Sequence, residues 1–182
     1  GSGWHRGPGT PHAEVHAVAA ARQGGCTDFT GTTLYVNLEP CCHTGRTPPC
    51  TDLILATGIP RIVCGMTDPD SRVSGKGIDI LRNAGRTVVA GVLERECREL
   101  NAPFVTFHEK NRPYFTLKTA SSLDGKTATA TGESRWITGE ASRESVHRLR
   151  SRQAAILTGI GTVLADDPLL TVRLNEAGRS PV

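Results

Sequence analysis

The chain has 182 residues, of which 37% are hydrophobic, 21% are charged and 4% are aromatic. This length accommodates one large domain, or one domain with part of a second. The formal net charge of +3 is too small to predict a nucleic-acid-binding protein, and the few aromatic side chains offer little stacking surface for single strands. No apolar run approaches the roughly 20 residues of a membrane-spanning helix. We therefore expect neither a nucleic acid nor a membrane as partner.

The cysteine content indicates a reducing compartment. Six cysteines are too sparse for a disulfide scaffold, and no apolar segment near the start indicates secretion. In a reducing cytoplasm, clustered Cys and His more often bind metal or catalyse. Both ends of the sequence look cut, so we expect a fragment, with Gly1-Ser2 as a possible tag remnant.

The first 110 residues alternate between predicted helices and strands. The pattern predicts helices over residues 11–23, 50–57, 76–83 and 93–110, and strands over residues 33–38, 61–66 and 86–90. Prolines near two of the helix starts and glycines after three of the helices support these boundaries. Such alternation is typical of an α/β layered domain.

A domain boundary is expected near residues 111–113, which divides the chain into domains 1–110 and 111–182. The second part predicts strands over residues 114–119 and 154–158, and a helix over residues 139–152 whose charges match the helix dipole. About 70 residues are fewer than a complete domain usually has. We therefore expect an incomplete second domain.

The strongest motif is His12-Ala13-Glu14, followed by Pro40-Cys41 and then by Cys50. Zinc deaminases have the signature H-x-E with a later P-C-x-x-C. Here eight residues, not two, separate the cysteines. Because Cys41 follows a strand and Cys50 begins a helix, the loop can still bring both to one point. Three such ligands leave zinc its fourth position for water.

Glu14 is the candidate acid–base residue. Zinc lowers the pKa of a water from 15.7 to about 7, and the resulting hydroxide can attack a carbon that bears an amino group. A carboxylate beside it can take the proton from water and pass it to the leaving amine. His12 and Glu14 share one metal site only if the helix points end-on at it, which placing His12 in the first turn permits.

Other interpretations of these residues stay open. His16 lies one helical turn after His12, and the two could chelate a metal as in H-E-x-x-H, although Glu14 then stands in the wrong position. Cys42 could replace Cys41 as the ligand. The isolated cysteines are expected to be core or surface residues; they are Cys26, Cys64 and Cys97.

Residues 11–15 (PHAEV) and 38–50 (LEPCCHTGRTPPC) resemble the bifunctional riboflavin-biosynthesis deaminase/reductase family. The resemblance continues through residues 125–126, 132–139 and 159–173, and the long loop between the cysteines is typical of that family. It implies an α/β fold class: a three-layer cytidine-deaminase-like domain with a mixed sheet, followed by the start of a dihydrofolate-reductase-like α/β domain. The family's first helix and strands would precede this chain, and most of its reductase domain would follow.

The resemblance implies two activities of a cytoplasmic homodimer. A zinc-dependent hydrolase removes an amine from 2,5-diamino-6-ribosylamino-4(3H)-pyrimidinone 5′-phosphate, and a reductase uses NADPH to convert the ribosyl side chain of the product to ribityl. The matching deaminase residues are the zinc ligands His12, Cys41 and Cys50, the proton shuttle Glu14, and the substrate contacts His43, Gly45, Arg46 and Thr47. Arg46 could instead stabilise its loop through a carbonyl.

In the second part, the resemblance implies a substrate site and a cofactor site. The substrate contacts are Ser134, Arg150, Leu170 and Arg173, and the NADPH contacts are Ala120, Trp136, Thr162 and Asp166. Core packing is the alternative role for Trp136. Residues 159–162 match the first part of the dinucleotide-binding motif G-x-G-x-x-G, but Leu164 replaces its third glycine.

Two other functions compete with this one. The chain could be another zinc deaminase that acts on cytidine, deoxycytidylate or a base in RNA, although the long loop and the second part argue against it. It could also be a non-catalytic zinc module, but such sites usually have four protein ligands, and the motif supplies three plus a spare Cys42.

Overall fold

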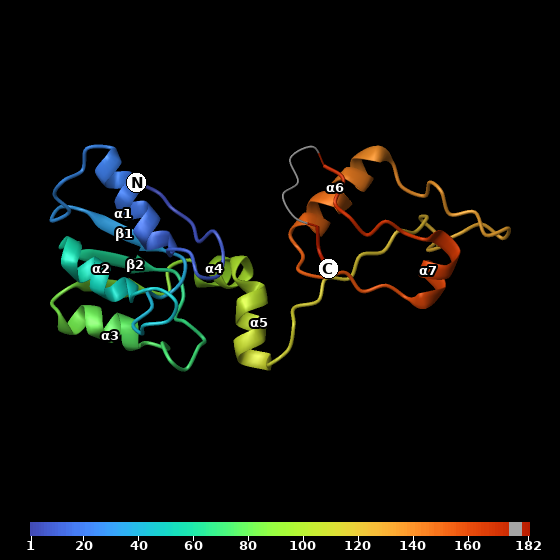
Figure 1. Ribbon diagram of the computed structural model, residues 1–182. Helices are drawn as coiled ribbons and strands as arrows, with labels where there is room; N and C mark the ends of the chain where they lie inside the picture. The colour runs from blue at the N-terminus through green and yellow to red at the C-terminus, as the bar shows by residue number, and fades with distance from the viewer. Residues whose placement is uncertain (175–179) are drawn as a thin grey trace. The chain divides into compact units, whose positions relative to one another are not determined.

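The computed structural model describes residues 1–174 and 180–182. The chain divides into two compact units, Gly1–Phe115 and Thr116–Val182, and each is described by itself (Figure 1). The sequence had placed the domain boundary a few residues earlier, between residues 110 and 111.

The first unit contains the helices and strands that its sequence predicts. Their bounds are α1 Ala13–Gln23, β1 Thr33–Val36, α2 Cys50–Thr57, β2 Arg61–Cys64, α3 Lys76–Asn83, β3 Thr87–Ala90, α4 Glu94–Leu100 and α5 Ala102–Lys110. The predicted helix over residues 93–110 is in fact two helices that meet at Asn101. Pro103 lies in the first turn of α5, where its missing N–H costs no helical hydrogen bond.

The three strands form a parallel sheet in the order β1-β2-β3. The register pairs Leu34 with Ile62, and Ile62 with Val88. These side chains pack in one hydrophobic core with residues of α1, α2 and α3, namely Val18, Ile54, Ile78 and Leu81. The predicted α/β class is therefore confirmed. The antiparallel strand that a mixed sheet requires is not among the described residues.

The parallel arrangement decides where the loops lie. Because all three strands run the same way, the segments that leave them meet at one edge of the sheet, where ligands bind in open α/β sheets. Residues 37–49 leave β1 at this edge, and residues 65–75 leave β2 there.

Helix α2 follows local sequence signals at both of its ends. Pro49 precedes α2, and Gly58 ends it in the left-handed conformation with φ 77°. Helix α1 begins at Ala13 and not at residue 11 as predicted, so His12 is its N-cap and does not lie in its first turn. Gly75 precedes α3 with φ 87° and has no side chain to cap it.

The second unit contains α6 (Glu140–Ser151) and α7 (Ile160–Asp166). The predicted helix over 139–152 is confirmed, but the predicted strands over 114–119 and 154–158 are wrong. A strand needs a partner for its backbone groups. In the described part of this unit, residues 154–158 find only single bonds with Val182: the Val182 N–H donates to Ala154, and the Ile156 N–H donates to Val182.

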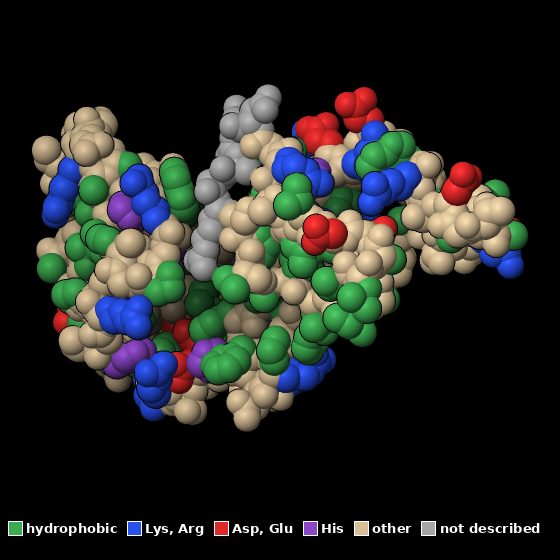
Figure 2. Space-filling model, turned by 45° about the vertical axis from the view of Figure 1, so that its right-hand side comes forward, with side chains coloured by type: hydrophobic (Ala, Val, Ile, Leu, Met, Phe, Trp, Pro, Cys, Tyr) green, Lys and Arg blue, Asp and Glu red, His purple; other side chains and the backbone are tan. Residues whose placement is uncertain are grey.

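The second unit buries little apolar surface. None of its described residues is buried, and Leu117 and Leu157 are 88% and 90% exposed. Figure 2 shows hydrophobic side chains at the surface of the face that it displays. Within the described residues, every helix is too short or too polar to cross a membrane.

Candidate metal centre and active site

Three metal-ligating side chains from separate segments meet at the carboxyl edge of the sheet. His12 precedes α1, Cys41 lies in the loop after β1, and Cys50 is the first residue of α2. The His12 Nδ1 atom lies 3.5 Å from Cys41 Sγ and 3.4 Å from Cys50 Sγ. All three ligand atoms lie within 4.8 Å of one another. The structure therefore brings together the three residues of the predicted zinc site.

The donor set and its spacing fit zinc. Bond lengths of about 2.3 Å to sulfur and 2.05 Å to nitrogen in a tetrahedron place those two atoms roughly 3.6 Å apart. The observed separations of 3.4 and 3.5 Å are close to that value. The Cys50 N–H donates to Cys41 Sγ at 3.3 Å, as expected of a thiolate at a helix start. Three protein ligands leave one position of the tetrahedron for water.

The electrostatics of the two thiols also favour a cation between them. The hydrogen bond from the Cys50 side chain lowers the pKa of Cys41 to about 5, and the Cys50 N–H and His12 act in the same direction. The same hydrogen bond, together with burial, raises the pKa of Cys50. Deprotonating Cys50 beside the Cys41 thiolate is therefore unfavourable, and a divalent cation between the two sulfurs would stabilise both thiolates.

Glu14 lies beside these ligands in the first turn of α1 and is only 9% exposed. Burial is the largest cause that raises its pKa above 4.5, and the neighbouring Cys41 raises it further. The neighbouring His12 and Cys50 act in the opposite direction and lower that pKa. A carboxyl whose proton is stabilised by burial suits a group that accepts and returns protons.

The outer edge of the His12 ring contacts Thr47. The Thr47 Oγ1 atom lies 3.3 Å from His12 Nε2, while Nδ1 faces the two sulfurs. A ligating histidine is usually held by a hydrogen bond at its other nitrogen. The sequence pattern gave no sign of this contact, because it joins residues that are distant in the chain.

The other predicted substrate contacts, His43, Gly45 and Arg46, lie in the same loop. His43 Nδ1 is buried and has no hydrogen-bond partner among the described residues. The Arg46 side chain is exposed, and it makes no hydrogen bond to residues 1–174 or 180–182, so the loop-stabilising alternative has no support there. The exposed Arg46 side chain is therefore available to a ligand, whereas His43 Nδ1 is shielded from solvent.

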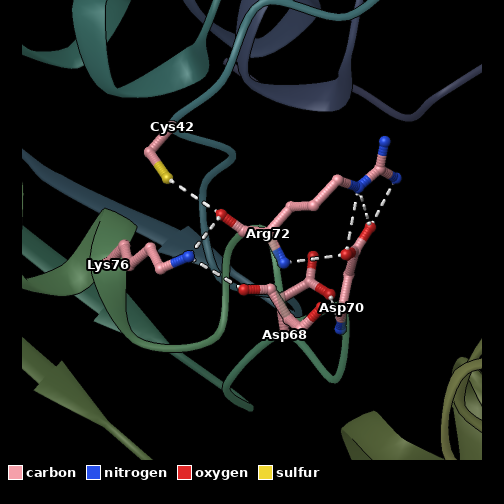
Figure 3. Close-up of polar contacts among 6 residues, drawn as sticks. Cys42, Asp68, Asp70, Arg72 and Lys76 are labelled. Atoms are coloured by element: carbon pink, nitrogen blue, oxygen red, sulfur yellow. Dashed lines mark hydrogen bonds and ion pairs between the residues drawn. The ribbon is translucent and has the colours of Figure 1, made fainter.

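The alternative ligands lie outside the metal cluster. His16 is not part of it, and its Nε2 atom is buried without a partner in the described chain. Cys42 directs its Sγ toward the Arg72 carbonyl at 4.0 Å (Figure 3). Neither the His12–His16 pair nor a replacement of Cys41 by Cys42 is supported by this geometry.

The loop after β2 carries acidic residues to which sequence reasoning gave no role. Asp68 and Asp70 are 6% and 7% exposed. Burial raises the pKa of Asp68, whereas the hydrogen bonds from Arg72 lower the pKa of Asp70 to about 2. Figure 3 shows the Arg72 guanidinium against the Asp70 carboxylate, with Lys76 directed at the loop carbonyls. The sequence signal that could have identified them is the position of Asp68 and Asp70 shortly after β2.

The substrate residues predicted in the second unit partly converge. Arg150 donates to the carbonyls of Leu169 and Thr171 at 3.3 and 2.7 Å, and Arg173 donates to Leu169 at 3.0 Å. Leu170 lies between these carbonyls in the chain. Ser134 is exposed in a separate loop.

The cofactor residues predicted in this unit lie on several segments. Trp136 is 71% exposed and stacks on the Arg143 guanidinium at 4.4 Å, so core packing is not its role among the described residues. Asp166 pairs with Arg135 at 3.6 Å, next to Trp136 in the chain. Thr162 lies on α7, and Ala120 lies in an irregular segment.

Comparisons with known proteins cover both units. Residues 1–66 match the family model of the cytidine and deoxycytidylate deaminase zinc-binding region, and residues 113–182 match that of the RibD C-terminal domain. The chain is 52% identical to riboflavin biosynthesis protein RibD of Aquifex aeolicus over 182 residues, covering 100% of this chain and 50% of that protein. It is 48% identical to RibD of Escherichia coli over 176 residues, covering 97% of this chain and 47% of that protein.

Solved structures agree with the sequence matches. A diaminohydroxyphosphoribosylaminopyrimidine deaminase/5-amino-6-(5-phosphoribosylamino)uracil reductase from Thermotoga maritima superposes with a TM-score of 0.87 and 49% identity, over 95% of this chain and 48% of that one. RibD of Acinetobacter baumannii superposes with a TM-score of 0.83 and 44% sequence identity, over 94% of this chain and 47% of that one. The chain thus spans about half the length of the relatives that it matches.

Proposed function

This chain belongs to the family of bifunctional riboflavin-biosynthesis deaminase/reductases, and we propose that its first unit catalyses the zinc-dependent hydrolytic deamination of a phosphorylated diaminopyrimidinone. The observation that carries the proposal is the cluster of His12, Cys41 and Cys50 with the buried Glu14 beside it. A purely structural zinc site requires neither an open ligand position nor a buried acid.

In this mechanism each residue has a separate task. When bound, zinc lowers the pKa of a water toward about 7. The Glu14 carboxylate would accept a proton from that water as the water oxygen bonds to the ring carbon that bears the amino group. Burial stabilises the protonated carboxyl until Glu14 passes this proton to the amino group, the C–N bond breaks and ammonia departs. Thr47 fixes the His12 ring, so that Nδ1 stays directed at the metal.

The substrate contacts are proposed from the loop that joins the two cysteines. Arg46 is exposed and has no partner among the described residues, and its guanidinium can bind the substrate phosphate with two parallel hydrogen bonds. His43, in the same loop, is the second proposed contact, and its buried Nδ1 has no hydrogen-bond partner among the described residues.

We propose that the second unit is the beginning of the NADPH-dependent reductase. The match of residues 113–182 to the RibD C-terminal domain supports this assignment. In it Ser134, Arg150, Leu170 and Arg173 contact the substrate, and Ala120, Trp136, Thr162 and Asp166 contact NADPH. A homodimer in the cytoplasm is the proposed working form, and the six free cysteines suit a reducing compartment.

The test compares ammonia release from the diaminopyrimidinone phosphate and from cytidine by the zinc-loaded chain. Glu14→Gln should retain zinc and lose roughly 10²- to 10⁴-fold in rate, since it removes the proton-transfer group but no ligand. Glu94→Gln, in the exposed first turn of α4, is the matched control and should be unchanged. Activity on cytidine alone would indicate a different deaminase. Zinc binding without ammonia release from either substrate would indicate a structural site.

A further inference from the structure

Glu39 is a buried carboxylate that lies two residues before the metal ligand Cys41. It is 3% exposed, and its partners are all backbone N–H groups. Oε2 accepts from Asp68 at 3.0 Å and from Gly75 at 2.8 Å. Oε1 accepts from Gly77 at 2.9 Å and from Ile78 at 3.2 Å. A carboxylate offers about four acceptor sites, so its capacity is fully used.

The donors show that Glu39 caps a helix from outside its own segment. Gly77 and Ile78 are the second and third residues of α3, whose N–H groups are normally bonded by the N-cap side chain. Here the N-cap is Gly75, which has no side chain. The Glu39 carboxylate replaces it, and its charge also favours the start of a helix.

Backbone contacts also hold the segment from Glu39 to Cys41 in place. The Glu39 N–H donates to the Met66 carbonyl at 3.0 Å, and the Cys41 carbonyl accepts from Thr51 in α2 at 3.2 Å. Pro40 is fully buried, and its carbonyl lies so close to Gly77 that a Cβ there would be 2.2 Å from the oxygen. The segment that carries Cys41 is thus fixed between the starts of α3 and α2.

Cys42, the residue after Cys41, also contacts the loop that follows β2. Its Sγ faces the Arg72 carbonyl, which also accepts from Lys76 Nζ at 3.3 Å (Figure 3). The loop after β2 therefore touches the Cys41 segment at both ends, through the Glu39 carboxylate and through Cys42.

We propose that Glu39 is a positioning residue for the metal ligand Cys41. A serine or aspartate in place of Gly75 would cap α3 without involving the segment that carries Cys41. Capping by Glu39 makes the position of Cys41 depend on the start of α3 and on the loop that carries Asp68. The inference rests on the metal site of the proposed function.

The first experiment measures zinc affinity by competition with a chelator, and cobalt absorption as a probe of ligand geometry. In Glu39→Gln, the amide nitrogen must face two N–H donors in either orientation, so two bonds are lost. Zinc affinity should fall roughly 10- to 100-fold, as for other residues that support a ligand. The control is Val88→Ala in β3, a core truncation in a strand without site residues, which should lower the melting temperature and keep both metal readouts.

A second measurement uses the wild-type chain and covers the case in which Glu39→Gln does not fold. Removing zinc should accelerate hydrogen exchange at the amides of Gly75, Gly77 and Ile78, because their acceptor is tied to Cys41. Unchanged exchange, or a folded Glu39→Gln with wild-type zinc affinity, would overturn the inference. Failure of the wild-type chain to bind zinc would instead overturn the proposed function.

Discussion

Replacing Gly77 by alanine sets two effects of opposite sign against each other. Alanine in a helix is favoured over glycine by about 1 kcal/mol. The new Cβ, however, would lie 2.2 Å from the Pro40 carbonyl oxygen, where real Cβ atoms essentially never come closer than 3.0 Å. The backbone must therefore move by at least 0.8 Å, the difference between 3.0 and 2.2 Å. Such overpacking costs about 1–3 kcal/mol, so we expect net destabilisation.

The same displacement should reach the metal site. Zinc sites tolerate errors in ligand distance of roughly 0.2 Å, and Pro40 directly precedes Cys41. Gly77→Ala should therefore lower the melting temperature and weaken zinc binding, both measurable by thermal unfolding and chelator competition. Gly31→Ala is the matched control, because nothing lies within 4 Å of a Cβ there. A Gly77→Ala chain that is as stable as wild type and binds zinc equally well would refute the reasoning.

Two further predictions concern Thr47 and Asp70. Thr47→Val removes the hydroxyl beside His12 Nε2 and should weaken zinc binding roughly tenfold, whereas Thr47→Ser should not; equal affinities in a chelator competition would contradict this role. Asp70→Asn removes the ion pair with Arg72 and should lower the free energy of unfolding at pH 7. The loss should be only about 1 kcal/mol, because Arg72 is exposed and solvent screens the pair. Since the pKa of Asp70 is lowered from 3.8 to about 2, this loss should disappear as the pH falls through that window. Urea unfolding at pH 7 and pH 2 would decide, and an equal loss at both would argue against the pair.

Local signals predicted the first unit well. Helix α2 has the predicted bounds because Pro49 and Gly58 restrict the backbone at its two ends. The metal site was identifiable because one histidine and two cysteines meet the ligand requirements of zinc, and a glutamate two residues after the histidine completes the deaminase motif. Such signals depend on a few neighbouring residues, so they need no knowledge of the whole fold.

Contacts between distant segments were not predictable in this way. The start of α3 has no capping side chain of its own, and nothing near Gly75 in the sequence points to Glu39 as the substitute. The contact between Thr47 and His12 depends equally on how the loop folds back. The wrong strand over residues 154–158 has the same origin, because its apolar pattern is local whereas a strand needs a partner.

The shared direction of the three strands also separates two kinds of sequence change. Residues 24–32, 58–60 and 84–86 lead into β1, β2 and β3, so they lie at the opposite edge from Cys41 and Asp68. Substitutions that raise thermal stability can be concentrated in these three connections without changing the geometry of the proposed metal site. The molecule thus has one edge for chemistry and another on which adaptation can act.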